Sequence, residues 1–233
     1  MKRSTVNVKE ILKFTGVDWN SAVGASLLNM HTARMKAIGD YFESGFEGLR
    51  VLDMGCGSGL VSSSLVEMGA KVVAADIVPE NVELTLQRVK SSKITGRVGS
   101  VEDILKQEGP RSFDAVISLE VIEHVDNQDT FVNSLCDMSK NTLVLSTINR
   151  TIKSYALAIL AAEHATGMVP VGTHDWFKFV KPEEIERIVH GADLHTDKLV
   201  GLVFNPVTNS WCTSNHLFDV NFMYFASRSR LGI

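Results

Sequence analysis

The sequence predicts an α/β protein with a mostly parallel seven-stranded sheet and helices on both of its faces. Short apolar runs alternate with longer stretches of helical periodicity, and this rhythm is typical of a sheet built from β-α-β units. One apolar run continues into a glycine-rich turn, VLDMGCGSG at residues 51–59, which is typical of nucleotide-binding sheets. We therefore expect a ligand at the carboxyl ends of the strands.

Seven strands are predicted from apolar runs, at residues 49–54, 71–75, 94–98, 113–119, 142–147, 198–204 and 220–226. Helices are predicted from periodicity and capping residues at 27–42, 60–68, 79–91, 127–139 and from Pro182 onward. Pro79 suits a first helical turn, and Asp126 or Asn127 can cap the helix that follows.

The length is that of one domain, residues 1–233. Within it we expect an N-terminal helical cap at residues 1–45. We also expect an inserted segment at residues 149–180 that faces the substrate or a membrane.

Composition excludes several classes of protein. The net charge is −4 and no basic cluster is interleaved with aromatic residues, so we expect no nucleic-acid partner. There is neither a signal peptide nor an apolar run of about 18 residues, so we expect no spanning helix. Three scattered cysteines, Cys56, Cys136 and Cys212, form no disulfide framework or zinc pattern, which favours a reducing compartment.

The glycine-rich turn distinguishes between two classes of cofactor. Gly55, Gly57 and Gly59 alternate, whereas a dinucleotide fingerprint starting at Gly55 needs glycine at the position of Leu60. The spacing resembles the S-adenosylmethionine loop of class I methyltransferases, where the backbone of Gly55 and Gly57 would approach the cofactor. The alternative is a turn in which the glycines serve only the bend.

Five further residues are candidates for the cofactor site. Asp76 ends the second apolar run, where a carboxylate can hold ribose hydroxyls, and Asp53 would support the loop. Arg34 lies on the predicted helix before the core and can pair with the methionyl carboxylate, unless it is a solvated surface arginine. Asp103 follows the third strand, where an acid meets the adenine or charges a helix N-terminus. Leu119 would pack against the cofactor.

Two acids and an imidazole follow the fourth strand, at Glu120, Glu123 and His124. In a helical turn these positions share a face, so they could bind a divalent cation that lowers the pKa of a bound phenol. Without a metal, His124 is the general base and a glutamate orients its ring. In a third interpretation the side chains only cap the turn. His124 and Glu120 are the catalytic candidates.

Later segments of the chain carry a more specific signal: STINRTIKSY at 146–155, VPVGTHDWFKFVK at 169–181, GLVFNPVTN at 201–209 and DVNFMY at 219–224. They resemble the ubiquinone-biosynthesis O-methyltransferases, which methylate phenolic hydroxyls on polyprenylated rings. The resemblance implies S-adenosylmethionine contacts for Arg34, Gly55, Asp76 and Leu119. It also implies a divalent ion, usually taken as magnesium, on Glu120, Glu123 and His124.

The same resemblance implies partners and a location. Family substrates carry a long polyprenyl tail dissolved in a membrane, so the apolar residues 155–169 are expected to contact a membrane surface peripherally. The expected location is the matrix face of the mitochondrial inner membrane in a eukaryote or the cytoplasm of a bacterium, with a multi-enzyme ubiquinone-biosynthesis complex as a further partner.

The N-terminus departs from the family pattern. The region holds one tryptophan, Trp19, where a pair is usual, and His31 and Thr32 stand where Asn and Pro are usual. The alternatives are a methyltransferase for another small phenol and an inactive scaffold subunit.

Overall fold

The computed structural model describes residues 4–8, 10–11, 22–157, 175–208 and 210–228. Within these ranges eight strands form one sheet in the order β3-β2-β1-β4-β5-β8-β6-β7. The strands are β1 (Arg50–Met54), β2 (Lys71–Asp76), β3 (Ile94–Val98), β4 (Phe113–Leu119), β5 (Ser139–Ile148), β6 (His195–Asn205), β7 (Ser210–Ser214) and β8 (Asn221–Ser227). The first five strands are parallel, whereas β8 is antiparallel to β5 and β6, and β7 is antiparallel to β6.

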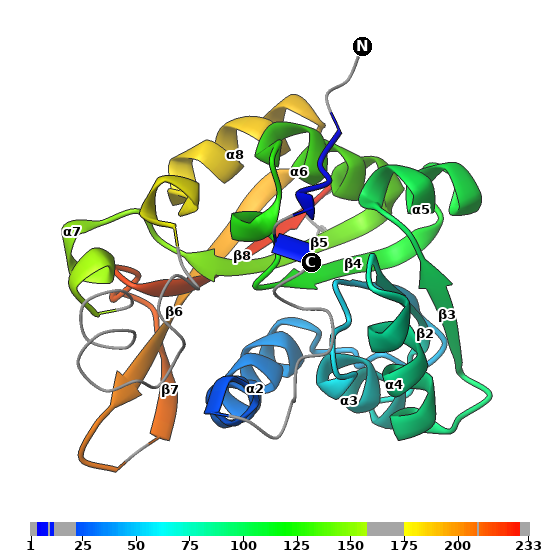
Figure 1. Ribbon diagram of the computed structural model, residues 1–233, viewed down its shortest axis with the longest axis horizontal. Coiled ribbons are helices and arrows are strands. Elements are labelled where there is room, and N and C mark those ends of the chain that lie inside the picture. The colour runs from blue at the N-terminus through cyan, green and yellow to red at the C-terminus, as the bar shows by residue number, and fades with distance from the viewer. Residues whose placement is uncertain (1–3, 9, 12–21, 158–174, 209, 229–233) are drawn as a thin grey trace.

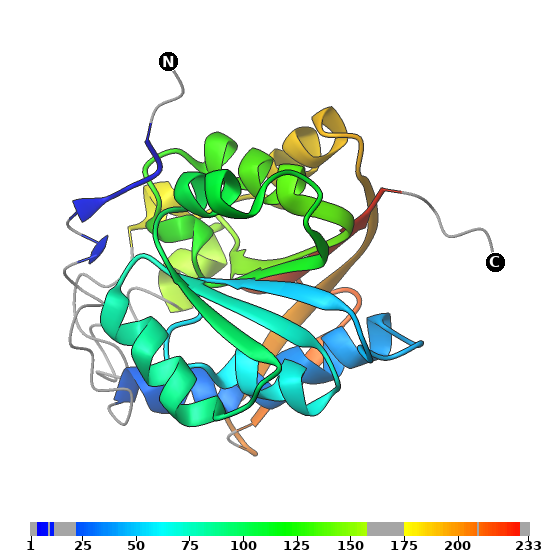
Figure 2. The same ribbon diagram turned by 90° about the vertical axis from the view of Figure 1, so that its right-hand side faces the viewer.

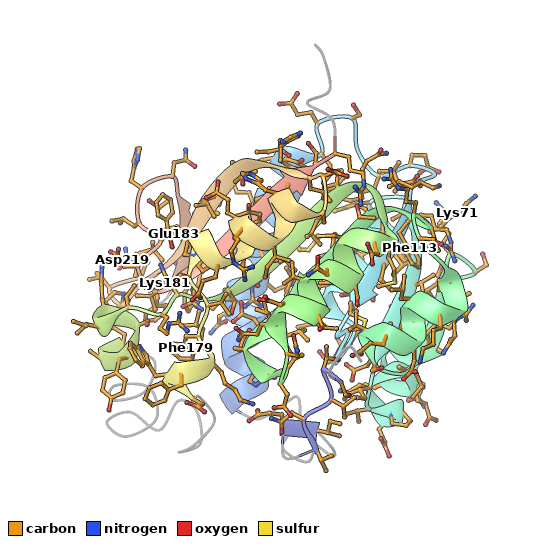
Figure 3. The ribbon with its side chains drawn as sticks, turned by 90° about the horizontal axis from the view of Figure 1, so that it is seen from above. Lys71, Phe113, Phe179, Lys181, Glu183 and Asp219 are labelled. Carbon is orange, nitrogen blue, oxygen red and sulfur yellow. The ribbon has the colours of Figure 1, made fainter. Side chains whose placement is uncertain are left out.

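Helices cover both faces of the sheet (Figure 1). One face carries α5 (Val101–Glu108), α6 (Gln128–Met138) and α8 (Pro182–Gly191), which lie side by side when the molecule is seen from above (Figure 3). The other face carries α2 (Ala22–Tyr41), α3 (Leu60–Glu67) and α4 (Pro79–Val89). The described ranges also contain the short turns η1 (Ile122–His124), α7 (Ile152–Ser154) and η3 (Trp176–Lys178).

Each face of the sheet buries its own apolar cluster. Successive residues of a strand point to opposite faces, so Leu52 of β1 joins the cluster that contains Phe131 of α6. Its neighbour Val51 joins the cluster that contains Ile38 of α2 and Leu65 of α3. All five side chains are buried. A sheet covered on both sides explains why the central strands read as continuous apolar runs.

The predicted α/β architecture is confirmed, but the strand count of seven is wrong by one. After β6 the chain turns back and adds β7 at the edge of the sheet. The residues of β7, SWCTS, are half-buried or exposed, so they show neither an apolar run nor a clear alternation.

The helix α5 is a second element that lies outside the predicted helices. Its N-terminus is a capping box in which Ser100 Oγ accepts from the Asp103 N–H at 3.3 Å and Asp103 Oδ2 accepts from the Ser100 N–H at 3.2 Å. The Ser-x-x-Asp spacing at Ser100 and Asp103 therefore indicates the start of this helix in the sequence.

Parts of the predicted cap and inserted segment, residues 12–21 and 158–174, lie outside the described residues. None of the helices that the structure describes has both the length and the apolar character needed to cross a membrane.

Candidate active site

A cavity of about 770 Å³ lies at the carboxyl ends of β1, β2 and β4. Its walls include the glycine loop after β1, Asp76 at the end of β2, and Leu119 and Glu120 around the end of β4. Arg34 of α2 and the N-terminal residues 5–7 and 10–11 close other sides. In Figure 2 those N-terminal residues (dark blue) lie on the left, at the end of the sheet where these strands finish. The cavity therefore occupies the place where parallel α/β sheets bind ligands.

The glycine loop requires glycine at two positions. Gly55 has a φ of +84°, and a Cβ there would lie 2.3 Å from Cγ2 of Val121. Gly59 has a φ of +80° and begins α3, where a Cβ would lie 2.9 Å from the Cα of Thr85. The loop backbone is therefore packed tightly between α4 and the turn after β4, with its inner surface on the cavity.

Asp53 accepts a hydrogen bond from α3, which follows the glycine loop, and Asp76 accepts one from the loop itself. Ser62 Oγ donates to Asp53 at 2.6 Å, and burial raises the pKa of Asp53 to about 6. Asp53 does not line the cavity. Asp76 does, and it accepts from the Gly57 N–H at 3.0 Å and the Val78 N–H at 2.9 Å. Burial also raises the pKa of Asp76.

Arg34 is a buried cation in the wall of the cavity. Only 4% of its surface is exposed, so it is not the solvated surface arginine of the alternative interpretation. Its Nη2 lies 2.9 Å from Oε1 of Glu120, while its buried Nε has no hydrogen-bond partner among the residues that the structure describes. A buried donor without a partner costs about 1–3 kcal/mol, so this side chain is suited to an anionic ligand.

The turn after β4 gives the two acids Glu120 and Glu123 different hydrogen-bond partners. Glu120 has a φ of +57°, which is a strained left-handed conformation for a residue with a Cβ. Its Oε1 accepts from Ser146 Oγ at 2.7 Å. Glu123 lies in η1, is 4% exposed, and accepts from Thr147 Oγ1 at 2.9 Å. Burial raises the pKa of Glu123, and the charge of Glu120 raises it further.

The imidazole of His124 contacts a residue that is a partner of neither Glu120 nor Glu123 in the hydrogen bonds given above. Its Nδ1 lies 2.9 Å from Oε2 of Glu10, a residue of the N-terminal segment. A left-handed Glu120 and the 3-10 turn η1 stand in place of the helical turn on which the shared face of Glu120, Glu123 and His124 was predicted. Across the described ranges, no three acidic, imidazole or thiol side chains are grouped so that they could hold a metal ion. These residues do not fit the expected magnesium ion.

The remaining cofactor candidates differ in position. Leu119 lines the cavity. Asp103 is not among the residues of its wall, because its carboxylate is engaged with Ser100 at the start of α5. Ser100 and Val101 line the cavity in its place. The geometry of Asp103 is that of a helix cap, which was the alternative interpretation.

An apolar wall extends the cavity away from the glycine loop. β6 and β7 contribute Leu202, Phe204 and Trp211, and the ring centroids of Phe204 and Trp211 lie 5.4 Å apart. Leu157 and Leu217 also line the cavity, and each is 48% exposed. Sequence patterns did not reveal this wall, because its residues come from separate segments of the chain, and Trp211 comes from the edge strand β7.

Comparisons with known proteins agree with this architecture. A family model described as a methyltransferase domain matches residues 29–199. The ubiquinone biosynthesis O-methyltransferase of Methylocella silvestris is 34% identical over 250 residues, covering 97% of this chain and 96% of that protein. The mitochondrial ubiquinone biosynthesis O-methyltransferase of Arabidopsis thaliana is 40% identical over 190 residues, covering 79% of this chain. That match spans only 58% of the length of the Arabidopsis protein.

Solved structures share the fold. A magnesium protoporphyrin IX methyltransferase from Synechocystis PCC 6803 with bound SAH gives a TM-score of 0.68 at 20% identity, covering 95% of this chain and 94% of that one. A SAM-dependent methyltransferase from Aquifex aeolicus gives a TM-score of 0.63 at 15% identity, covering 91% of this chain and 100% of that one. At these identities the similarity shows the fold alone.

Proposed function

Because the chain belongs to the ubiquinone biosynthesis O-methyltransferases, we propose that it transfers a methyl group from S-adenosylmethionine to a phenolic hydroxyl of a polyprenylated catechol or hydroquinol. One observation carries the proposal. A single cavity joins the glycine loop, which suits the cofactor, to the apolar wall of β6 and β7, which suits a prenylated ring.

The wall of the cavity supplies groups that match the parts of this cofactor. Arg34 offers buried donors to the methionyl carboxylate, and Asp76 offers acceptors to the ribose hydroxyls. Leu119 and Val101 provide apolar surface for the adenine. When bound, the cofactor supplies an electrophilic methyl group on a positively charged sulfur. The protein therefore has to orient the methyl group rather than activate it.

The acceptor hydroxyl has to lose a proton while its oxygen bonds to the methyl carbon and the bond from sulfur to that carbon breaks. We assign this proton to His124, which lines the cavity next to Glu120. The carboxylate of Glu120 contacts Arg34, so it compensates a buried positive charge in the wall of the cavity.

We route no step of this mechanism through a metal ion, because no three acidic, imidazole or thiol side chains of the described residues are grouped so that they could hold one. We expect methyl transfer to continue at its full rate in excess chelator. Loss of turnover that returns on adding magnesium would contradict this arrangement and would show that the three side chains regroup.

Methyl transfer itself is tested with isotopically labelled S-adenosylmethionine and two acceptors, a short-tailed prenyl catechol and catechol without a tail. We expect a higher kcat/KM for the prenylated acceptor. Equal values would favour a methyltransferase for another small phenol. Cofactor binding without turnover on either acceptor would favour the scaffold subunit.

We also propose that the open end of the cavity contacts a membrane surface. Ile152 is 86% exposed and lies in α7, which precedes the cavity-lining Leu157 in the chain, and Phe177 is 81% exposed. The ring of Trp176, which contacts Phe177, also contacts Tyr155 beside α7. Lys153 lines the cavity within the same turn and would suit anionic headgroups. The surface would be the matrix face of the mitochondrial inner membrane or a bacterial cytoplasmic membrane, and assembly with other enzymes of the pathway would take place there.

The membrane proposal is tested by liposome sedimentation of Ile152→Glu/Leu157→Glu. The double variant should lose sedimentation while keeping its affinity for S-adenosylmethionine. Leu86→Glu is the control, because Leu86 is 37% exposed but lies on α4. Unchanged sedimentation of the double variant would contradict the proposal.

A further inference from the structure

The N-terminal segment, residues 4–8 with 10–11, is tied to two elements beside the cavity. The Thr5 N–H donates to Glu102 Oε1 at 2.9 Å, and Thr5 Oγ1 donates to Glu102 Oε2 at 2.7 Å. The carbonyl of Thr5 accepts from the Asp126 N–H at 3.1 Å. The segment therefore connects the start of α5 to the loop that follows η1. The turn η1 itself carries His124.

Asn7 turns the segment toward the cavity. Its Nδ2 donates to Asp126, and its Oδ1 accepts from the Glu10 N–H at 3.1 Å. Its carbonyl accepts from the Ile11 N–H at 3.0 Å, so helical hydrogen bonding begins here with Asn7 as the cap. This turn places Glu10 in the wall of the cavity with only 8% of its surface exposed.

The contact between Glu10 and His124 determines which ring nitrogen of His124 carries the proton. When Glu10 is ionised its carboxylate only accepts hydrogen bonds, and the Nδ1 atom at 2.9 Å from Glu10 Oε2 is then the donor. In the neutral ring the lone pair is then on Nε2. A general base needs such a lone pair, and a carboxylate behind the ring also stabilises the imidazolium that forms.

Among the acids that the structure describes, Glu10 is the one within hydrogen-bond distance of the His124 ring. Glu123 is directed to Thr147, and Glu120 is directed to Ser146 and Arg34. A sequence argument based on local spacing selects Glu123, which is adjacent to His124. The folded chain instead supplies a carboxylate from 114 positions away.

We propose that Glu10 is a positioning residue that holds His124 in the Nδ1–H tautomer for proton abstraction. This inference rests on the proposed methyl transfer. It gives the N-terminal segment a chemical task in addition to closing the cavity, since the segment brings the second half of a carboxylate–imidazole pair.

The test compares three variants of the full chain. Glu10→Ala removes the carboxylate, Glu10→Gln keeps an acceptor oxygen without the charge, and Glu102→Gln weakens the attachment of Thr5 without changing the contact at His124. Three quantities are measured for each: kcat on the prenylated catechol, calorimetric affinity for S-adenosylmethionine, and the His124 tautomer from long-range ¹H–¹⁵N NMR spectra.

We expect Glu10→Ala to lower kcat about 10–100-fold, as is usual when a group that orients a functional imidazole is removed. The affinity for S-adenosylmethionine should change by less than about threefold, and the His124 spectrum should shift toward the Nε2–H form. Glu10→Gln should recover part of kcat and most of the tautomer, and Glu102→Gln should keep both.

Two results would overturn the inference. Equal losses of kcat in Glu10→Ala and Glu102→Gln would mean that the segment acts only by closing the cavity. A His124 tautomer that is the same in the parent protein and in Glu10→Ala would mean that Glu10 does not orient the ring. Lack of turnover in the parent protein would instead contradict the proposed function, and the NMR comparison would still decide whether Glu10 sets the tautomer.

Discussion

The two ends of the cavity are assembled in different ways. The cofactor end is built from local turns, in which Gly55, Gly57 and Asp76 follow directly from two neighbouring parallel strands. The acceptor end is assembled from distant segments: Glu10 meets His124, and Trp211 reaches the cavity from an edge strand. The cofactor end therefore depends on backbone conformation, and the acceptor end depends on tertiary contacts between side chains.

The largest effect is expected at the cofactor end, from Gly55→Ala. The new Cβ would lie 2.3 Å from Cγ2 of Val121, a branched side chain with few rotamers, at a φ of +84°. Steric overlap and left-handed strain together should lower the free energy of unfolding by about 2–5 kcal/mol, as measured by denaturant titration.

Two controls separate these contributions to the Gly55→Ala effect. Val121→Ala combined with Gly55→Ala removes the overlap and should recover the steric part, which leaves about 1–2 kcal/mol of strain. Gly191→Ala adds a Cβ where no atom lies within 4 Å and should be neutral. A Gly55→Ala protein as stable as the parent would contradict the tight packing of the loop.

Arg34→Ala should have the next largest effect, because it removes the ion pair between Arg34 and Glu120 in the wall of the cavity. Removing the guanidinium leaves Glu120 without its cation at 2.9 Å, which should cost about 3 kcal/mol in unfolding free energy. Loss of donors to a ligand carboxylate should weaken S-adenosylmethionine binding by about 1.5–3 kcal/mol in calorimetry. The control is Arg187→Ala, whose exposed pair with Asp129 should contribute less than about 1 kcal/mol. Similar results for both variants would show that burial of Arg34 is unimportant.

Sequence reasoning was sufficient for the elements that depend on local signals. The strands from β1 to β5 are apolar because helices cover both faces, so their order and approximate ends could be predicted. The glycine spacing and Asp76 lie at strand ends, so their position beside the cavity followed from the fold class. α5 was predictable as well, because Ser100 and Asp103 have the spacing of a capping box and the buried Val101 and Ile104 have helical spacing.

The remaining parts depend on information that local sequence does not contain. Glu120, Glu123 and His124 have helical spacing, but a left-handed Glu120 sends them to different partners. No spacing rule links Glu10 to His124, because the contact exists only after α5 and η1 are in place. β7 is a half-exposed edge strand whose pairing with β6 follows from the turn between them rather than from hydrophobicity.

A pH-dependent contribution to stability is expected from Asp53, beneath the glycine loop. Burial raises the folded-state pKa of Asp53 from 3.8 to about 6, so between these values the folded protein binds more protons than the unfolded chain. Stability contributed by this residue therefore falls as the pH rises from about 4 to 6, by up to about 3 kcal/mol.

Denaturant titrations across this range, repeated for Asp53→Asn, test the assignment. The variant keeps an acceptor for Ser62 but cannot ionise, so its stability should decline less between pH 4 and 6. Ser63→Ala on the exposed side of α3 serves as a control that should follow the parent profile. Parallel profiles for the parent and Asp53→Asn would contradict the raised pKa.

The smallest effect is expected at the acceptor end, from Trp211→Ala. Trp211 stacks at 5.4 Å from Phe204 in the apolar wall, so its loss should raise KM for the prenylated catechol about tenfold, or about 1.4 kcal/mol. KM for catechol without a tail and the affinity for S-adenosylmethionine should not change. Trp176→Ala is the matched control, because Trp176 donates to the Thr151 carbonyl and is not part of the cavity wall. If Trp211→Ala affected both acceptors equally, the apolar wall would bind the ring rather than the tail, because only the ring is common to the two acceptors.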